Sequence, residues 1–221
     1  MSIIVGVDVG QRHESSAVCV VEYQRRNEQG IDLSRLRTPG RGVNIAHERT
    51  SDHFTVRHLE RIPAGKPYLE IARRVGDIWS GIQNRGRSVF RGYVDLTGLG
   101  DPVLDLLTRE TRTSMLTPVY FTHGDRRDRE NGAIRLGKAW LVSRLQTLFQ
   151  GGTLHMPRER PPEYAELIKD LLAYEPKLPA NANELYGAFR VGRHDDMVTA
   201  LGLAVQERPA SLEFGYLADF V

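Results

Sequence analysis

Acidic residues stand at three places in the sequence where an ionised side chain is costly unless something compensates its charge. Asp8 lies inside an otherwise apolar segment, and Asp95 ends another apolar segment. Asp195 and Asp196 directly precede a run of small and apolar residues. An ionised carboxylate loses its hydration among apolar neighbours, and coordination of a metal ion is one of the few ways to offset that loss. The sequence therefore indicates a metal site built from carboxylates.

The ligand type indicates the metal, because Mg²⁺ favours oxygen ligands and keeps several waters, which suits a few carboxylates on separate elements. Two such ions about 3.5–4 Å apart can activate a water and stabilise the leaving oxygen of a phosphodiester. A helix beginning at Asp195 and Asp196 would place a partial positive charge beside these carboxylates. Gly98 and Gly100 would let the backbone after Asp95 pass close to metal or substrate. This chemistry is that of a metal-dependent nuclease.

Each acidic residue taken alone also has an ordinary structural explanation. Asp8 could be a turn residue at the end of a strand, and Asp95 could cap a turn. Asp195 or Asp196 could be the N-cap of the helix that follows. The combination is harder to attribute to capping, because a mixed sheet would bring two strand ends and a helix start together.

The elements that must position these residues follow from hydrophobic periodicity. The predicted strands are 3–9, 16–22, 54–62, 88–94, 115–121 and 153–156, with a weaker hairpin at 178–189, and the predicted helices are 68–82, 101–108, 137–149, 162–174 and 195–207. Early strands joined directly and later strands joined by helices predict an α/β protein, a mixed β-sheet with helices on both faces. Residues 24–52 are polar and without clear periodicity, which predicts a long loop or insertion. Residues 123–131 predict a charged loop.

Length and composition are those of one globular domain in the cytoplasm. The chain has 221 residues, of which 40% are hydrophobic and 26% charged, a balance typical of globular proteins. No apolar run approaches the roughly 20 residues that span a bilayer, and no basic region precedes the apolar N-terminal stretch, so a signal peptide is not expected. Cys19 is the only cysteine. Its apolar surroundings predict a buried core thiol.

Basic residues are candidates for contacts with a phosphate backbone, although the net charge is only +2. Arginine suits bidentate phosphate binding. Arg126, Arg127 and Arg129 form one cluster, and a second cluster lies between residues 85 and 91. Either cluster could touch nucleic acid, or be a solvated loop.

Several of these segments resemble the nuclease domain of phage large terminase subunits, which is ribonuclease-H-like. Its three acidic motifs are similar to Val-Gly-Val-Asp8-Val-Gly, to Val-Asp95-Leu-Thr-Gly-Leu-Gly-Asp-Pro-Val, and to Arg-His194-Asp195-Asp196-Met-Val-Thr-Ala-Leu-Gly-Leu-Ala. Residues 137–149 and 152–157 resemble the segment between the second and third motifs. The resemblance covers nearly the whole chain apart from 24–52, and it implies a ribonuclease-H-like fold.

The resemblance also implies an activity, a cofactor and partners. It implies an endonuclease that cuts concatemeric phage DNA into genome lengths during packaging, with little sequence preference and with two Mg²⁺ or Mn²⁺ ions. By position, Asp8, Asp95 and Asp196 would be the main ligands, with Asp195 a bridging carboxylate or one just outside the ligand set. His194 would orient a ligand or phosphate, or be an exposed residue. The implied partners are double-stranded DNA, a packaging ATPase, the small terminase and the portal, and we expect a monomer in isolation.

One departure from that family concerns its ATPase motor, which is not expected in this chain. The only near match to a phosphate loop is 132–139, where Ala139 replaces the Ser or Thr that would bind Mg²⁺ and no strand is predicted in front. Lys138 is instead expected to begin a helix near the acidic residues and contact a phosphate, or to be a plain surface lysine. We therefore expect a single nuclease domain over 1–221, either excised or working with a separate motor.

Three other functions compete with this interpretation. A junction resolvase of the same fold would use similar acids but bind branched DNA as a stable dimer. An actin-like or sugar-kinase-like ATPase would also match the segment around Asp8, but it needs two such domains and this chain is too short. A non-catalytic DNA-binding packaging component could have kept the fold and lost activity, against which the intact acids argue.

Overall fold

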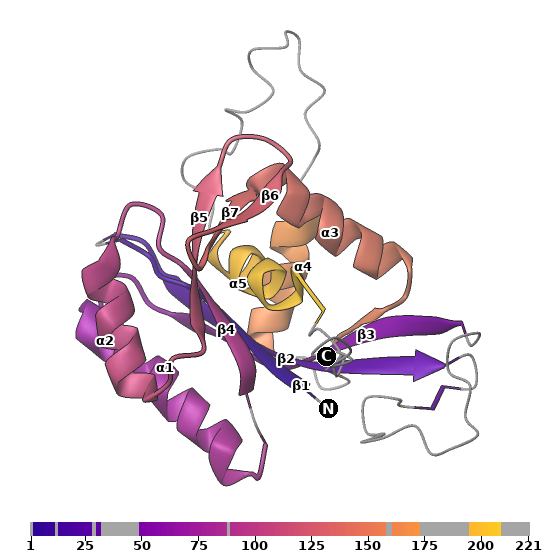
Figure 1. Ribbon diagram of the computed structural model, residues 1–221, viewed down its shortest axis with the longest axis horizontal. Coiled ribbons are helices and arrows are strands. Elements are labelled where there is room, and N and C mark those ends of the chain that lie inside the picture. The colour runs from indigo at the N-terminus through magenta and orange to yellow at the C-terminus, as the bar shows by residue number, and fades with distance from the viewer. Residues whose placement is uncertain are drawn as a thin grey trace, which may run out of the picture.

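The computed structural model describes residues 2–11, 13–27, 30–31, 49–87, 89–157, 161–172 and 195–208. Within these ranges the chain forms one sheet and five helices (Figure 1). The strands are β1 Ser2–Asp8, β2 Ser16–Asn27, β3 Thr50–Ile62, β4 Val89–Asp95, β5 Leu116–Thr122, β6 Arg127–Glu130, β7 Ala133–Gly137 and β8 Leu154–His155. The helices are α1 Tyr68–Asn84, α2 Asp101–Thr111, α3 Lys138–Gln150, α4 Pro162–Leu172 and α5 Asp196–Val205.

The sheet has eight strands in the order β6-β7-β5-β4-β1-β2-β3-β8. Strands β1, β2 and β3 are antiparallel neighbours, whereas β1, β4, β5 and β7 run parallel. Parallel neighbours need a crossover connection, and α1 and α2 supply the two crossovers that lead to β4 and β5. The mixed sheet expected from the sequence is therefore confirmed.

Helices cover both faces of this sheet, as Figure 1 shows. Helices α1 and α2 pack together on one face, and α3, α4 and α5 lie on the other. Side chains alternate between the two faces along a strand. Ile3, Val5 and Val7 of β1 belong to the core beneath α1 and α2, and Ile4 belongs to the core around α5. By this alternation, Asp8 points toward the α5 face.

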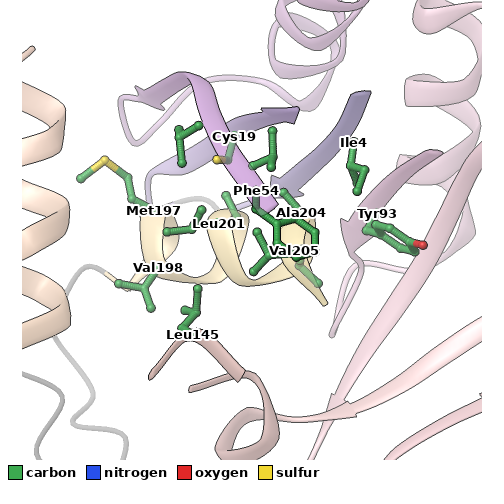
Figure 2. Packing of buried hydrophobic residues seen from close by; sticks show 14 of the residues in the cluster. Ile4, Cys19, Phe54, Tyr93, Leu145, Met197, Val198, Leu201, Ala204 and Val205 are labelled. Atoms are coloured by element: carbon green, nitrogen blue, oxygen red, sulfur yellow. The ribbon is translucent and has the colours of Figure 1, made fainter. Parts of the chain in front are cut away.

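Helix α5 is buried along its whole length and lies directly against β1 and β2 (Figure 2). Its small residues allow this close approach. A Cβ atom added at Gly6 of β1 would lie 2.0 Å from the carbonyl oxygen of Ala200 and 2.8 Å from the backbone nitrogen of Ala204. Only a glycine at position 6 is compatible with this packing. The packing holds α5 against β1, so that the start of α5 lies near the end of β1, where Asp8 is.

The structure corrects two loop predictions. Strands β2 and β3 extend to Asn27 and from Thr50, so both ends of the predicted loop 24–52 are strand. Their polar residues pair with one another, as in the bond from Arg25 Nε to Thr50 Oγ1 at 3.0 Å, and hydrophobic periodicity does not report such pairing. Residues 32–48 and the predicted hairpin at 178–189 lie outside the described residues.

The second correction is the hairpin of β6 and β7, which replaces most of the charged loop predicted at 123–131. Its turn is Asn131-Gly132, with φ values of 50° and 80°. Asn-Gly is the preferred sequence for a two-residue hairpin turn, because both positions need positive φ. The polar, charged character of β6 concealed this signal.

None of the helices in the described part of the chain is both long and apolar enough to cross a membrane.

Candidate metal centre

Asp8 and Asp95 lie side by side in the sheet. They are register partners on the adjacent parallel strands β1 and β4. Across β1 and β2 Asp8 pairs with Ala17, and across β2 and β3 Ala17 pairs with Arg61. Residues paired in register point to the same face, so Asp95, Asp8, Ala17 and Arg61 form one line of side chains beneath α5, called here the cross-strand row. The two distant carboxylates thus converge as the sequence predicts.

The Asp8 carboxyl group is surrounded by other acids. Burial raises its pKa well above the ordinary value, and the negative charges of Asp95, Asp195 and Asp196 raise it further. The positive charge of Lys138 acts in the opposite direction without cancelling the shift. Four carboxylates from β1, β4 and the start of α5 therefore interact at one place. Such a cluster is unfavourable while all its members are ionised.

Asp95 is held in place by the turn that follows it. Its Oδ1 accepts hydrogen bonds from the backbone N–H of Thr97 at 2.8 Å and from the Thr97 hydroxyl at 2.6 Å. The Thr97 hydroxyl in turn accepts the N–H of Phe121 on β5 at 2.8 Å. Burial raises the pKa of Asp95 although the bonds from Thr97 lower it. Gly98 and Gly100 have φ values of 76° and 78°, and these keep the turn tight.

Asp195 lies just before α5 and faces the first residue of α3. Its Oδ2 forms an ion pair with Lys138 Nζ at 3.1 Å, and both side chains are about one third exposed. The Lys138 ammonium also lies over the Phe121 ring, 5.4 Å from its centroid. Lys138 therefore begins a helix beside the acidic residues, as the sequence analysis expected.

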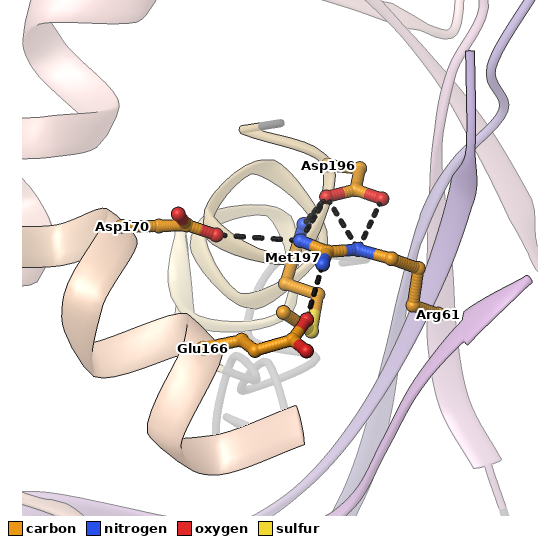
Figure 3. Close-up of polar contacts among 5 residues, drawn as sticks. All are labelled: Arg61, Glu166, Asp170, Asp196 and Met197. Atoms are coloured by element: carbon orange, nitrogen blue, oxygen red, sulfur yellow. Dashed lines mark hydrogen bonds and ion pairs between the residues drawn. The ribbon is translucent and has the colours of Figure 1, made fainter. Parts of the chain in front are cut away.

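Asp196 has a different environment from its neighbour. Its side chain is only 6% exposed and is bound on both oxygens by the Arg61 guanidinium (Figure 3). The backbone N–H of Met197 donates a further bond to Asp196 Oδ1 at 2.9 Å. Arg61 also contacts Glu166 and Asp170 on α4.

The donor set is compatible with hard divalent cations. Carboxylate oxygens are the ligands that Mg²⁺ and Mn²⁺ prefer, and a cation would relieve the repulsion that raises the pKa of Asp8. In the ranges that the structure describes, no three acidic, histidine or cysteine side chains are gathered closely enough to hold a metal as they stand. Two of the four carboxylates are engaged in ion pairs, Asp195 with Lys138 and Asp196 with Arg61.

A cleft with a volume of about 430 Å³ opens beyond the carboxyl ends of β1 and β4. It is formed by the segments that follow the two central acids and by the start of α1, and its lining residues are Gln11, His13, Glu14, Tyr68, Gly98 and Leu99. None of the four aspartates lines this cleft, and Tyr68 and Leu99 pack against the core beneath α1 and α2, on the sheet face opposite to α5.

Two of the arginines suggested for DNA contact are engaged in ion pairs. Arg127 and Arg129 pair with Glu207, just after α5, and thereby tie the β6–β7 hairpin to that helix. Arg126 is exposed at the start of the hairpin. His194 lies outside the described residues.

Two residues of the centre were missed by the sequence analysis. Thr97 sits inside the Asp95 motif, and its hydroxyl could have been identified as a local hydrogen-bond donor, because threonine often bonds a neighbouring side chain or backbone group in a turn. Arg61 carries no sequence signal, because its role depends on pairing between strands and on helices far along the chain.

Comparisons with known proteins bear on the fold. No family model and no curated protein matches the sequence, but three solved structures are similar. The human cytomegalovirus terminase nuclease domain, soaked with manganese, is 14% identical with a TM-score of 0.51, over 92% of this chain and 81% of that chain. The large terminase nuclease of thermophilic phage G20c is 16% identical with a TM-score of 0.49, over 93% and 82%. Thermus thermophilus RuvC is 13% identical with a TM-score of 0.31, over 91% and 90%.

At these identities the similarity concerns the arrangement of elements. The match to the cytomegalovirus domain extends over almost all of this chain, so it includes the central strands and the crossover helices. The mixed eight-stranded sheet with helices on both faces is the ribonuclease-H-like fold of terminase nuclease domains.

Proposed function

We propose that this protein is a metal-dependent endonuclease that hydrolyses phosphodiester bonds in DNA. The observation that carries the proposal is the pairing of Asp8 with Asp95 in register, beneath the acidic start of α5. Carboxylates from β4 and from the start of α5 raise the pKa of Asp8 on β1, so their charges interact there. A structural role does not account for that accumulation of negative charge, whereas the binding of cations does.

The ligands proposed for two Mg²⁺ or Mn²⁺ ions are Asp8, Asp95 and a carboxylate from the Asp195–Asp196 pair. When bound, such ions lower the pKa of a water and stabilise charge on the phosphate. Thr97 fixes the orientation of Asp95 through its hydroxyl. Lys138 balances part of the negative charge and, once Asp195 turns toward a cation, its ammonium can bind a DNA phosphate.

The biological substrate proposed is concatemeric double-stranded viral DNA, cut during genome packaging. Support comes from the resemblance of the three acidic motifs and from the fold shared with the cytomegalovirus terminase nuclease domain. In this role the protein works with a packaging ATPase, a small terminase and a portal. The cleft lined by Gln11, His13 and Tyr68 supplies polar groups for DNA beyond the ends of β1 and β4.

A plasmid nicking assay with a metal titration tests the proposal. We expect the wild type to convert supercoiled plasmid to open-circle and linear forms with Mg²⁺ or Mn²⁺, and to be inactive in chelator. Ca²⁺ should bind but support cleavage poorly, because its looser geometry positions the attacking water less well. Asp95→Ala should be inactive with every metal. Cleavage by Asp95→Ala at the wild-type rate would refute the assignment.

A further inference from the structure

Arg61 occupies a central place next to the metal centre although it belongs to no recognisable motif. It lies near the end of β3, in the cross-strand row, and its side chain is 21% exposed. Arg61 Nε lies 2.9 Å from Asp196 Oδ2, and Nη2 lies 2.8 Å from Asp196 Oδ1 (Figure 3). The guanidinium also donates from Nη1 to Glu166 and from Nη2 to Asp170, the latter at 3.3 Å. One cation thus joins the sheet to both α4 and α5.

The pairing leaves Asp196 poorly placed to bind a metal ion. Both its oxygens accept from Arg61, and Oδ1 also accepts the backbone N–H of Met197. A metal ion at Asp196 would have to displace this planar, two-pronged contact in a buried setting. The guanidinium would then lie beside a cation of like charge, which is unfavourable at low dielectric.

Asp195 has the opposite properties. It is about one third exposed, and its carboxylate forms an ion pair with the flexible Lys138 side chain. Its negative charge raises the pKa of both Asp8 and Asp95. Asp196 affects the pKa of Asp8 less than Asp195 does. Asp195 therefore interacts with both sheet carboxylates and is held by a weaker, more exposed ion pair than Asp196 is.

We propose that Arg61 is a positioning residue of the metal centre, an inference that rests on the nuclease function proposed above. Arg61 neutralises Asp196, withholds its carboxylate from the cations, and fixes the start of α5 so that Asp195 supplies the third ligand. This assignment reverses the order implied by the motif resemblance, in which Asp196 is the main ligand and Asp195 is secondary.

Helix α4 completes the arrangement. Glu166 and Asp170 lie one turn apart on α4; Glu166 binds Arg61 Nη1, and Asp170 shares Nη2 with Asp196 (Figure 3). The guanidinium is therefore held by carboxylates from two helices at once. A lysine could not reproduce this arrangement, because its single ammonium lacks the planar fork that contacts both oxygens of Asp196.

Calorimetric titration with Mn²⁺ tests which aspartate is the ligand, using the full chain as wild type, Asp195→Asn and Asp196→Asn. We expect Asp195→Asn to weaken Mn²⁺ binding at least about tenfold, and Asp196→Asn to bind close to wild type. An equal or larger loss in Asp196→Asn would overturn the role of Arg61 while leaving the nuclease proposal intact. A wild type that binds no Mn²⁺ would refute both proposals.

Cleavage kinetics test the positioning role itself. At a temperature where every variant is folded, Arg61→Met should lower kcat by about tenfold or more with little change in KM for DNA. Arg61→Lys should recover only part of the loss. Arg74→Met is the matched control. Arg74 also binds both oxygens of a carboxylate, that of Glu60, at 2.8 and 2.7 Å. Glu60 directly precedes Arg61 and therefore points to the opposite face of the sheet. Arg74→Met should keep the wild-type kcat.

A purely structural Arg61 would give a different pattern. Arg61→Met would then lower Tm, as Arg74→Met would, but leave the kcat of the folded protein unchanged, and this result would overturn the proposal. If Arg61→Met does not fold, Arg61→Lys, which keeps the positive charge, replaces it. The kcat of Arg61→Lys should lie below that of the wild type, and equal kcat values would contradict the positioning role.

Discussion

At the level of single residues, four aspartates bring negative charge together where β1 and β4 end and α5 begins. Asp8 is the most strongly affected, because it is buried beside three other aspartates. The sequence was sufficient to identify Asp8, Asp95, Asp195 and Asp196 as a group, since each interrupts or borders an apolar segment. It could not divide roles between Asp195 and Asp196, because that division depends on Lys138 and Arg61, which lie far away along the chain.

Asp8→Asn should make the metal-free protein more stable at neutral pH. Burial and neighbouring acids raise the pKa of Asp8 in the folded state, so ionised Asp8 destabilises the fold above that pKa and has no such effect below the unfolded value of about 3.9. A tenfold difference in proton affinity between the folded and unfolded states is worth about 1.4 kcal/mol, and about 1 kcal/mol moves Tm by about 2–4 °C.

Thermal melts in chelator at several pH values measure this effect. The Tm advantage of Asp8→Asn should be present at pH 7 and vanish near pH 4. Saturating Mn²⁺ should reverse the order at pH 7, because only the wild type gains stability from bound metal. A variant that is less stable than the wild type in chelator at pH 7 would contradict the repulsive cluster.

Thr97→Val should reduce both stability and activity. Valine has a similar shape, but it removes the hydroxyl that donates to Asp95 and accepts from the Phe121 N–H. These hydrogen bonds lie in an exposed turn, so losing them should cost about 0.5–1.5 kcal/mol, and loss of a bond that orients a ligand lowers activity about 10–100-fold. Thr97→Ser keeps the hydroxyl and serves as the control. Denaturant melts and nicking rates report the two effects, and equal rates for both variants would count against the orienting bond.

Among the elements, α5 contributes most to the site, because its start carries two acids and it packs on the strand that carries a third. Its apolar run and the strands of the central sheet were predicted correctly, since burial on two faces leaves a clear hydrophobic pattern. The elements at the margins of the sheet were not predicted correctly. Strand β6 and the outer parts of β2 and β3 are polar, so only the Asn131-Gly132 turn could have revealed any of them.

Gly6→Ala should displace α5 and destabilise the protein. The new Cβ would lie 2.0 Å from the Ala200 carbonyl oxygen, and backbone cannot move aside as a flexible side chain can. We expect a loss of about 3 kcal/mol or more, at the upper end of overpacking effects. Gly81→Ala in α1 is the control, because a Cβ there meets nothing within 4 Å and should stabilise the helix by about 0.5–1 kcal/mol. Denaturant unfolding of both variants measures the difference, and a neutral Gly6→Ala would contradict the close packing.

At the scale of the whole molecule, the net charge of +2 does not tell where the charged residues gather. Carboxylates gather under α5, and several arginines elsewhere are engaged in ion pairs, as Arg127 and Arg129 are with Glu207. The composition alone therefore could not identify a DNA-binding surface. Lys138 is the cation that both the sequence and the structure place at the centre.

DNA binding should depend steeply on salt. Duplex binding measured with Ca²⁺ between about 50 and 200 mM salt should weaken strongly, because each phosphate contact releases counterions. Lys138→Met should reduce the slope of log K against log salt by about one. Binding that is insensitive to salt would exclude phosphate contacts as the main attraction. An unchanged slope in Lys138→Met would exclude Lys138 as one of those contacts.

The most direct test of the account is anomalous X-ray diffraction from Mn²⁺-soaked crystals. We predict anomalous density bridging Asp8 and Asp95, with the carboxylate of Asp195 turned from Lys138 toward the metal and Asp196 still bound to Arg61. Well-ordered carboxylates of Asp8 and Asp95 with no anomalous density between them at saturating Mn²⁺ would contradict the metal centre on which the proposed nuclease depends.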